Sequence, residues 1–154
     1  MKYSLDTSSL IEPWHRLYPP DVTPRLWDEL LPDLIAAGEL RAIQEVRIEL
    51  EQQDDALLAW ATSQTGLFVE IDADVQIAVK EVMRQHAKLV DINSARSGAD
   101  PFVIAFALIN GGIVVCEEKP RSPINPKIPD VCSSLGVRCM KMLDLIREEA
   151  WSFH

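Results

Sequence analysis

The chain has 154 residues, of which 47% are hydrophobic and 25% charged, and its formal net charge is −9. This length suits one domain (residues 1–154) with a substantial core, and the hydrophobic content is too high for a disordered chain. No apolar run reaches the roughly 20 residues that cross a bilayer, and Asp6 comes too early for a signal peptide. We therefore expect a single cytoplasmic domain without a membrane partner.

The strongly negative charge argues against broad attraction to nucleic acid, because phosphate binding draws on clustered Lys and Arg. A nucleic-acid substrate would need a local positive patch. The candidates are Lys119, Arg121 and Lys127 in one segment and Arg84 with Lys88 on a predicted helix. Solvated surface charge is the simpler interpretation of the same residues. The three cysteines lack the spacing of a zinc site or a disulfide framework.

The first elements alternate between strand and helix. Lys2–Leu5 predicts a strand, and the capping side chains of residues 6–9 predict a helix directly after it. The next helix has Pro24 at its first position and ends at Gly38. Pro32 lies inside this helix and should kink it, because proline cannot donate the backbone hydrogen bond.

Leu40–Ile43 predicts a second strand, and the helix that follows from about Glu45 places Glu45 and Glu49 on one face, four residues apart. Two further helices flank a short apolar run that suits either a strand or a buried loop. The helices are expected at Asp54–Ala61 and Asp74–His86, and the run is Leu67–Ile71.

The last part of the chain continues the alternation. Asp100-Pro101 is a strong helix start, and residues 110–112 (Asn-Gly-Gly) predict a turn before another strand. That strand is Ile113–Cys116; a loop at Lys119–Pro129, a strand at Val137–Met140 and a helix at Leu143–Trp151 follow it. The pattern predicts a single-domain, three-layer α/β fold whose mostly parallel central sheet carries helices on both faces.

Four acids stand next to these apolar segments: Asp6, Glu49, Asp100 and Glu118. The carboxyl ends of parallel strands meet at one edge of a sheet, so we expect these side chains to converge there. Carboxylates that meet in a cleft repel one another and raise their pKa values unless a cation neutralises them, and oxygen ligands suit a hard ion. The pattern therefore predicts bound Mg²⁺ or Mn²⁺.

Each acid also has a simpler interpretation. Asp6 and Asp100 stand where helix-capping residues stand, and a glutamate on a helix is usually exposed. Glu45 competes with Glu49 as the second acid, since it lies one turn nearer the strand end. Glu117 and Glu118 alternate, so that one can face a cleft and the other solvent. The sequence leaves both choices open.

Five segments together resemble the PIN-domain family, which includes the toxins of VapC-type toxin-antitoxin pairs. Four of them hold the acids, and Lys127–Cys132 is similar to a mark of an uncharacterised PIN-like branch. The segments with acids are Tyr3–Ser8, Val46–Leu50, Asp100–Ala107 and Ile113–Glu118. Two departures stand out, because Cys116 replaces a small hydroxyl residue and Glu118 replaces the usual Asp.

The resemblance implies an Mg²⁺- or Mn²⁺-dependent ribonuclease that hydrolyses RNA phosphodiester bonds, with Asp6, Glu49, Asp100 and Glu118 as catalytic residues and Glu45 as a further metal ligand. It also implies restraint by a cognate antitoxin protein, and related proteins often pair into homodimers. The residues expected to contact the substrate are Thr7, Ser8, Lys119 and Arg121.

Two other functions fit the sequence. One is a PIN-like binding or regulatory module with little or no turnover, which the substituted fourth acid and the negative charge favour. The other is a phosphatase with Asp6 as nucleophile, similar to haloacid-dehalogenase-like proteins. Those proteins carry a second Asp where this chain has Ser8.

Overall fold

A computed structural model describes residues 1–53, 55–90 and 98–153 of the chain. Its centre is a five-stranded sheet in which every neighbouring pair is parallel, in the order β3-β2-β1-β4-β5. The strands are β1 (Tyr3–Leu5), β2 (Leu40–Ile43), β3 (Phe68–Val69), β4 (Ile113–Val115) and β5 (Cys139–Met140). This sheet and its helices confirm the predicted α/β fold.

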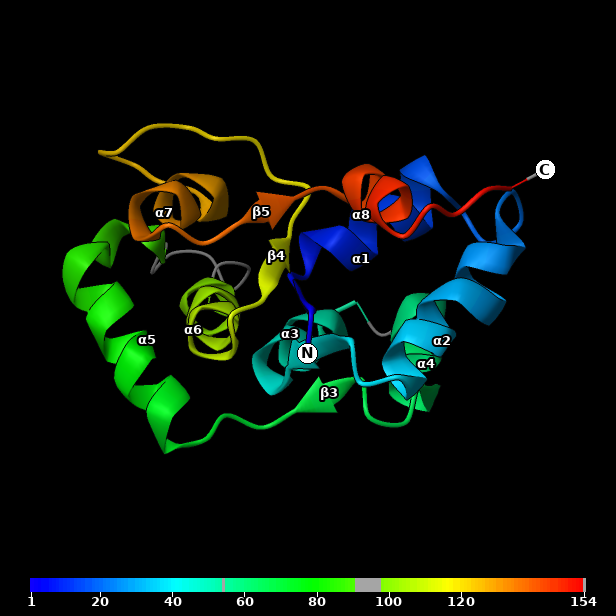
Figure 1. The fold of residues 1–154 in the computed structure, drawn as a ribbon, viewed down its shortest axis with the longest axis horizontal. Coiled ribbons are helices and arrows are strands. Elements are labelled where there is room, and N and C mark those ends of the chain that lie inside the picture. The colour runs from blue at the N-terminus through cyan, green and yellow to red at the C-terminus, as the bar shows by residue number, and fades with distance from the viewer. Residues whose placement is uncertain (54, 91–97, 154) are drawn as a thin grey trace.

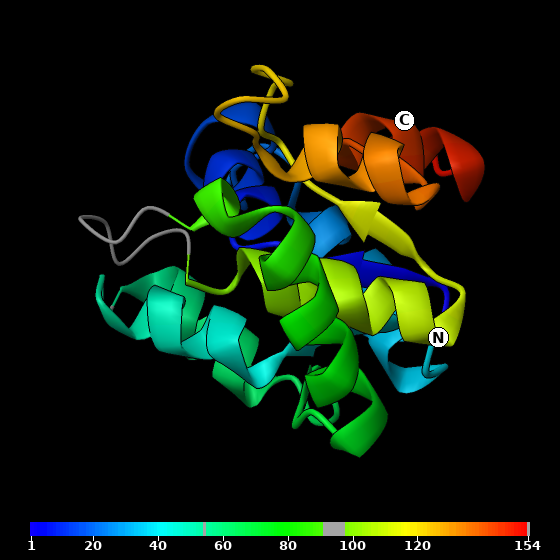
Figure 2. The ribbon, with the colours of Figure 1, turned by 90° about the vertical axis from the view of Figure 1, so that its left-hand side faces the viewer.

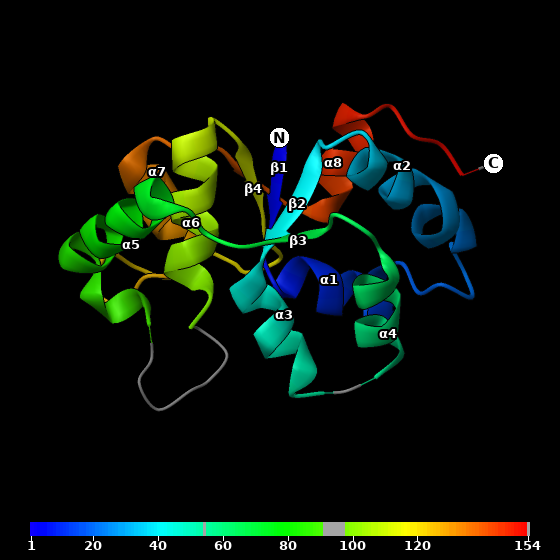
Figure 3. The same cartoon turned by 90° about the horizontal axis from the view of Figure 1, so that it is seen from below.

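The helices form layers around the strands (Figure 1). They are α1 (Ser8–Glu12), α2 (Leu31–Ala36), α3 (Gln44–Glu51), α4 (Ala56–Ser63), α5 (Ala73–Gln85), α6 (Asp100–Asn110), α7 (Ile128–Leu135) and α8 (Met142–Glu148), with π-helical turns η1 (Pro13–Leu17) and η2 (Leu26–Leu30) and a 3₁₀ turn η3 (Ala87–Leu89). Figure 3 shows α5, α6 and α7 on one side of the strands and α2 and α8 on the other.

Helix α6 lies between the sheet and α5, and Figure 2 shows α5 crossing its outer face. Its sequence explains this central position, because the helix is apolar over most of its circumference and buries Val103, Ile104 and Ala107. The hydroxyl of Ser4 on β1 donates a hydrogen bond to the Val103 carbonyl at 3.1 Å, which ties strand to helix. Gly111 ends the helix in the left-handed conformation (φ 64°) that glycine adopts without strain.

Most expected boundaries agree with the structure. The helix expected to end at Gly38 contains the π-helical turn η2 and then α2, and Pro32 lies in the first turn of α2, where its missing N–H costs little. The short run Leu67–Ile71 contains the edge strand β3. The helix expected at Asp54–Ala61 is α4, and Asp54 itself lies outside the described residues.

One expectation is wrong. The segment Lys119–Pro129 is not a loop to its end, because α7 begins at Ile128. Pro129 occupies the first turn of this helix, where a missing N–H costs nothing, and Asp130 accepts a hydrogen bond from the Lys127 backbone N–H at 2.8 Å. Proline-rich composition therefore concealed a helix start.

Three tryptophans from different elements interlock on the side of α4 and η2. Trp27 packs edge to face against Trp14, with ring centroids 4.8 Å apart, and against Trp60 at 5.0 Å. The indole N–H groups of Trp60 and Trp27 donate to the carbonyls of Trp27 and Tyr18. The tryptophans therefore pack these helical elements against one another.

Candidate functional site

The strand order reverses direction between β1 and β4, since β2 and β3 extend the sheet on one side of this pair and β5 on the other. In parallel α/β sheets a crevice opens at the carboxyl ends of the strands at such a switch point. Asp6 follows β1 directly, and its N–H donates to the Val115 carbonyl of β4 at 2.9 Å. Glu118 follows shortly after β4. The topology thus brings both acids to the same crevice.

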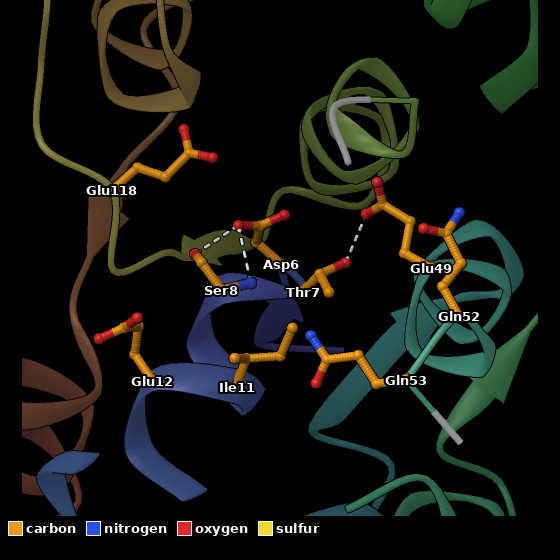
Figure 4. Close-up of a pocket in the computed structure, with 9 residues that line it drawn as sticks. All are labelled: Asp6, Thr7, Ser8, Ile11, Glu12, Glu49, Gln52, Gln53 and Glu118. Carbon is orange, nitrogen blue, oxygen red and sulfur yellow. Dashed lines mark hydrogen bonds between the residues drawn. The ribbon is translucent and has the colours of Figure 1, made fainter. Parts of the chain in front are cut away.

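A cleft of about 320 Å³ opens at this point, and Figure 4 shows its lining side chains. Asp6, Glu49 and Glu118 reach it from the ends of β1, α3 and β4 respectively. Thr7 and Ser8 line it as well. Five residues singled out in the sequence therefore meet around one cavity.

The cleft has four further lining residues that the sequence pattern did not single out: Ile11, Glu12, Gln52 and Gln53. Helical spacing could have found them. Ile11 and Glu12 lie three and four positions after Ser8, and the two glutamines stand in the same relation to Glu49.

Asp6 is 2% exposed. Its Oδ2 accepts hydrogen bonds from the Ser8 hydroxyl at 2.5 Å and the Ser8 N–H at 3.2 Å, while its other oxygen points away from Ser8 (Figure 4). The same Ser8 hydroxyl accepts the Glu117 N–H at 3.0 Å and so links α1 to the end of β4. Burial raises the pKa of the Asp6 carboxyl, and the contacts with Ser8 oppose that rise. One oxygen of Asp6 thus supports the helix start, as the capping interpretation expects.

Thr7 and Glu49 form a buried pair across the cleft. The Thr7 hydroxyl donates to Glu49 Oε1 at 2.6 Å instead of capping α1. Glu49 is only 8% exposed, and its Oε2 is buried without a hydrogen-bond partner among the described residues. Burial, reinforced by the charge of Asp6, raises the pKa of Glu49 to about 7, although the Thr7 hydroxyl opposes the rise.

Asp100 is the first residue of α6, and Ala99, not Asp100, occupies the cap position. Its side chain is 2% exposed. Burial raises the pKa of Asp100 to about 10, and the charges of Asp6, Glu118 and Glu49 add to the rise. A residue that resembles a helix cap in the sequence is therefore a buried acid coupled to the three acids of the cleft.

The two glutamates after β4 have different roles. Glu117 Oε1 accepts the Met142 N–H at 2.8 Å and so supports the start of α8. Glu118 lines the cleft, its Oε2 is buried without a partner among the described residues, and burial and the charge of Asp6 raise its pKa. The Cys116 sulfur accepts the Glu118 N–H at 3.3 Å and so holds the backbone of Glu118.

Asp100 and the remaining predicted site residues lie outside the lining of the cleft. Glu45 is half-buried on α3 with a buried Oε2 that lacks a partner in the described part of the chain, but it does not line the cavity that Glu49 lines. Lys119 and Arg121 are exposed. Arg121 still lowers the pKa of Glu118, and Lys127 lowers that of both Glu118 and Asp100, so their charges act on the cleft.

The donor chemistry of the cleft suits a hard divalent cation, because it offers several carboxylates and two orphaned oxygens. As the side chains stand, however, no three His, Cys, Asp or Glu residues within 1–53, 55–90 and 98–153 form a group that could hold a metal ion. Metal binding would require the carboxylates to turn toward a common point.

The fold and the cleft thus define a parallel α/β protein with a cluster of coupled, buried acids at its topological switch point. The chain belongs to the family described as a domain of unknown function, DUF4411, which matches residues 3–153. A comparison with curated proteins finds no match. No helix in the described ranges is long and apolar enough to cross a membrane.

Proposed function

We propose that this protein is an Mg²⁺- or Mn²⁺-dependent ribonuclease of the PIN type that hydrolyses RNA phosphodiester bonds. One observation carries the proposal: three acids from separate elements line the cleft at the switch point, and the buried Asp100 is coupled to them by charge. Burial raises the pKa of each of the four, and the charges of other acids in the group raise it further in all but Asp6. Raised carboxyl pKa values in a cleft are characteristic of functional sites. The choice of RNA hydrolysis as the reaction rests on the order of the acids along the chain and on the similarity to PIN domains.

The mutual repulsion of these acids is the main argument for a cation. A buried cluster of like charges destabilises the folded chain, and a divalent ion removes that cost when it binds. Asp6 and Asp100 would be its main anchors, Glu49 would orient the attacking water, and Glu118 would complete a second-metal or outer-shell position. Such an ion supplies Lewis acidity and offsets charge on the phosphate.

The protein side chains contribute positioning and proton transfer. Glu49 is suited to accept the proton of the attacking water, because its pKa of about 7 lies near neutral pH. The Thr7 hydroxyl fixes Glu49 Oε1, whereas the buried Oε2 has no hydrogen-bond partner among the described residues. Ser8 holds Asp6 in place through two hydrogen bonds.

The test is an RNA-cleavage assay with Mg²⁺, Mn²⁺ and a chelator. We expect cleavage that depends on the metal and is abolished in Asp6→Asn and Asp100→Asn. Glu117→Gln is the matched control, because Glu117 adjoins Glu118 in sequence but faces α8. Cleavage by Asp6→Asn at the wild-type rate would overturn the assignment.

A second candidate function is a PIN-like binding module without turnover. The observation that favours it is that the described acids do not form a ready-made metal group. Metal binding without RNA cleavage would select this function. A trapped phospho-aspartate on Asp6 would instead select the phosphatase, in which Ser8 takes the place of the second Asp.

As a ribonuclease in the cytoplasm, the protein would need restraint, which the PIN resemblance assigns to a cognate antitoxin protein. Co-expression with the product of an adjoining short reading frame, followed by co-purification and loss of RNA cleavage, tests this partner. Light scattering of the isolated chain tests the homodimer.

A further inference from the structure

A polyanionic substrate meets an electrostatic difficulty at this cleft. The described residues that line it include four carboxylates and no Lys or Arg, and the whole chain carries a net charge of −9. A phosphate strand would therefore be repelled unless a basic group stands beside the acids. The segment Lys127–Cys132, singled out in the sequence, contains the best-placed candidate.

Asp130 fixes the loop that precedes α7. Its Oδ2 accepts hydrogen bonds from two backbone N–H groups, those of Arg121 and Lys127, each at 2.8 Å. This carboxylate therefore closes the loop between the two basic residues, which Figure 1 shows arching over α7. The bonds set the backbone from which the Lys127 side chain extends.

The backbone of Lys127 is also held by its neighbours, because Pro126 and Ile128 are both buried. Lys127 is half-buried, whereas Lys119 and Arg121 are exposed. None of the ion pairs found among the described residues includes Lys127. Glu118 and Pro129, which lies in the first turn of the helix that Lys127 precedes, line one cavity of about 380 Å³, so the segment that holds Lys127 stands beside the acids.

The electrostatics agree with this placement. Lys127 is the basic residue that lowers the pKa of both Glu118 and Asp100, while Arg121 acts on Glu118. The Lys127 charge therefore acts on an acid that follows β4 and on the first residue of α6. A phosphate bound beside these acids would lie near the same charge.

We propose that Lys127 binds a phosphate of the substrate strand beside the acid cleft, and that Asp130 positions Lys127 by closing the 121–127 loop. This rests on the proposed function, because it assigns a substrate-binding residue to the same site. It gives the Lys127–Cys132 segment a physical role.

The first test measures binding of a fluorescent single-stranded RNA oligonucleotide to the Asp6→Asn protein in Mg²⁺, by anisotropy over a range of salt concentrations. Adding Lys127→Met should weaken RNA binding about tenfold. It should also lower the slope of log K against log salt by about 0.7, which is the contribution of one phosphate contact to a single strand. Lys127→Arg should keep most of the RNA affinity and most of the salt slope. Lys80→Met is the control, because Lys80 is exposed on the remote helix α5.

The second test separates positioning by Asp130 from a merely structural role. Asp130→Asn keeps a carbonyl oxygen that can accept both N–H groups, so it should bind RNA nearly as the parent does. Asp130→Ala should weaken RNA binding about as much as Lys127→Met, and adding Lys127→Met to it should cause little further loss. The melting temperature in each variant reports any loss of α7.

The outcomes distinguish this inference from the proposed function. If the wild-type protein cleaves RNA and Lys127→Met binds it with unchanged affinity and salt slope, the role of Lys127 is overturned while the function stands. Additive effects of Asp130→Ala and Lys127→Met overturn the positioning role of Asp130. If the protein neither binds nor cleaves RNA, both proposals fail.

Discussion

Asp100→Asn should stabilise the metal-free protein at neutral pH. Asp100 is 2% exposed, and burial with three neighbouring acids raises its pKa from 3.8 to about 10. The pKa of this acid is higher in the folded chain than in the unfolded chain. When the pH lies between these two pKa values, only the unfolded chain releases the proton, so a rise in pH favours unfolding. The penalty is absent below about pH 4 and grows up to about pH 10.

The size of the effect follows from the same linkage. Between the usual value of 3.8 and pH 7.5 the penalty reaches at most about 5 kcal/mol, at about 1.4 kcal/mol per pH unit. Asparagine has nearly the same shape and no proton to lose. We expect the variant to gain about 2 to 5 kcal/mol in free energy of unfolding at pH 7.5, and less than about 1 kcal/mol at pH 4.5.

Urea unfolding of the chelator-treated protein at both pH values measures this difference. Asp28→Asn is the matched control, because Asp28 is exposed on η2 and should change stability little. Mg²⁺ or Mn²⁺ should stabilise the wild-type protein at pH 7.5 and Asp100→Asn much less. The reasoning is refuted if the variant is no more stable than wild type at pH 7.5, or if its gain is equally large at pH 4.5.

Two further predictions concern the same cleft. Thr7→Val removes the hydroxyl that lowers the pKa of Glu49. The pH midpoint of Mn²⁺ binding, measured by calorimetric titrations across pH, should therefore move upward by about one unit. An unchanged midpoint would show that this hydrogen bond does not matter. Glu118→Gln should weaken Mn²⁺ binding at least about tenfold, whereas Glu117→Gln should leave it unchanged; equal effects in the two variants would contradict the assignment of Glu118 to the cleft.

The sequence predicted the alternation of strands and helices well, because apolar periodicity and the Gly and Pro signals act locally. Leu40–Ile43 is a strand with the expected bounds, and the turn after α6 depends on Gly111 as expected. The start of α7 was missed, since proline suits both a loop and the first turn of a helix.

The candidate site was predictable only as a set of acids that follow strands. Which of these acids line the cleft depends on contacts between elements that are far apart in the chain. Glu118 and not Glu117 lines the cleft because Glu117 is engaged by the start of α8. Glu49 and not Glu45 lines it because Glu49, one turn further along the same face of α3, is the residue that reaches Thr7. Neither contact has a local signature.

The sequence by itself thus determined the fold class and the acids that could meet, since both follow from side-chain periodicity and from the rule that functional groups gather at strand ends. The tertiary structure decided which acids are buried together and how strongly they repel one another. Asp100 illustrates the difference: its local sequence favours a helix cap, whereas the packing of α6 against the sheet buries it and raises its pKa to about 10. Burial and charge coupling are properties of the assembled elements, so the chain encodes them only through its folding.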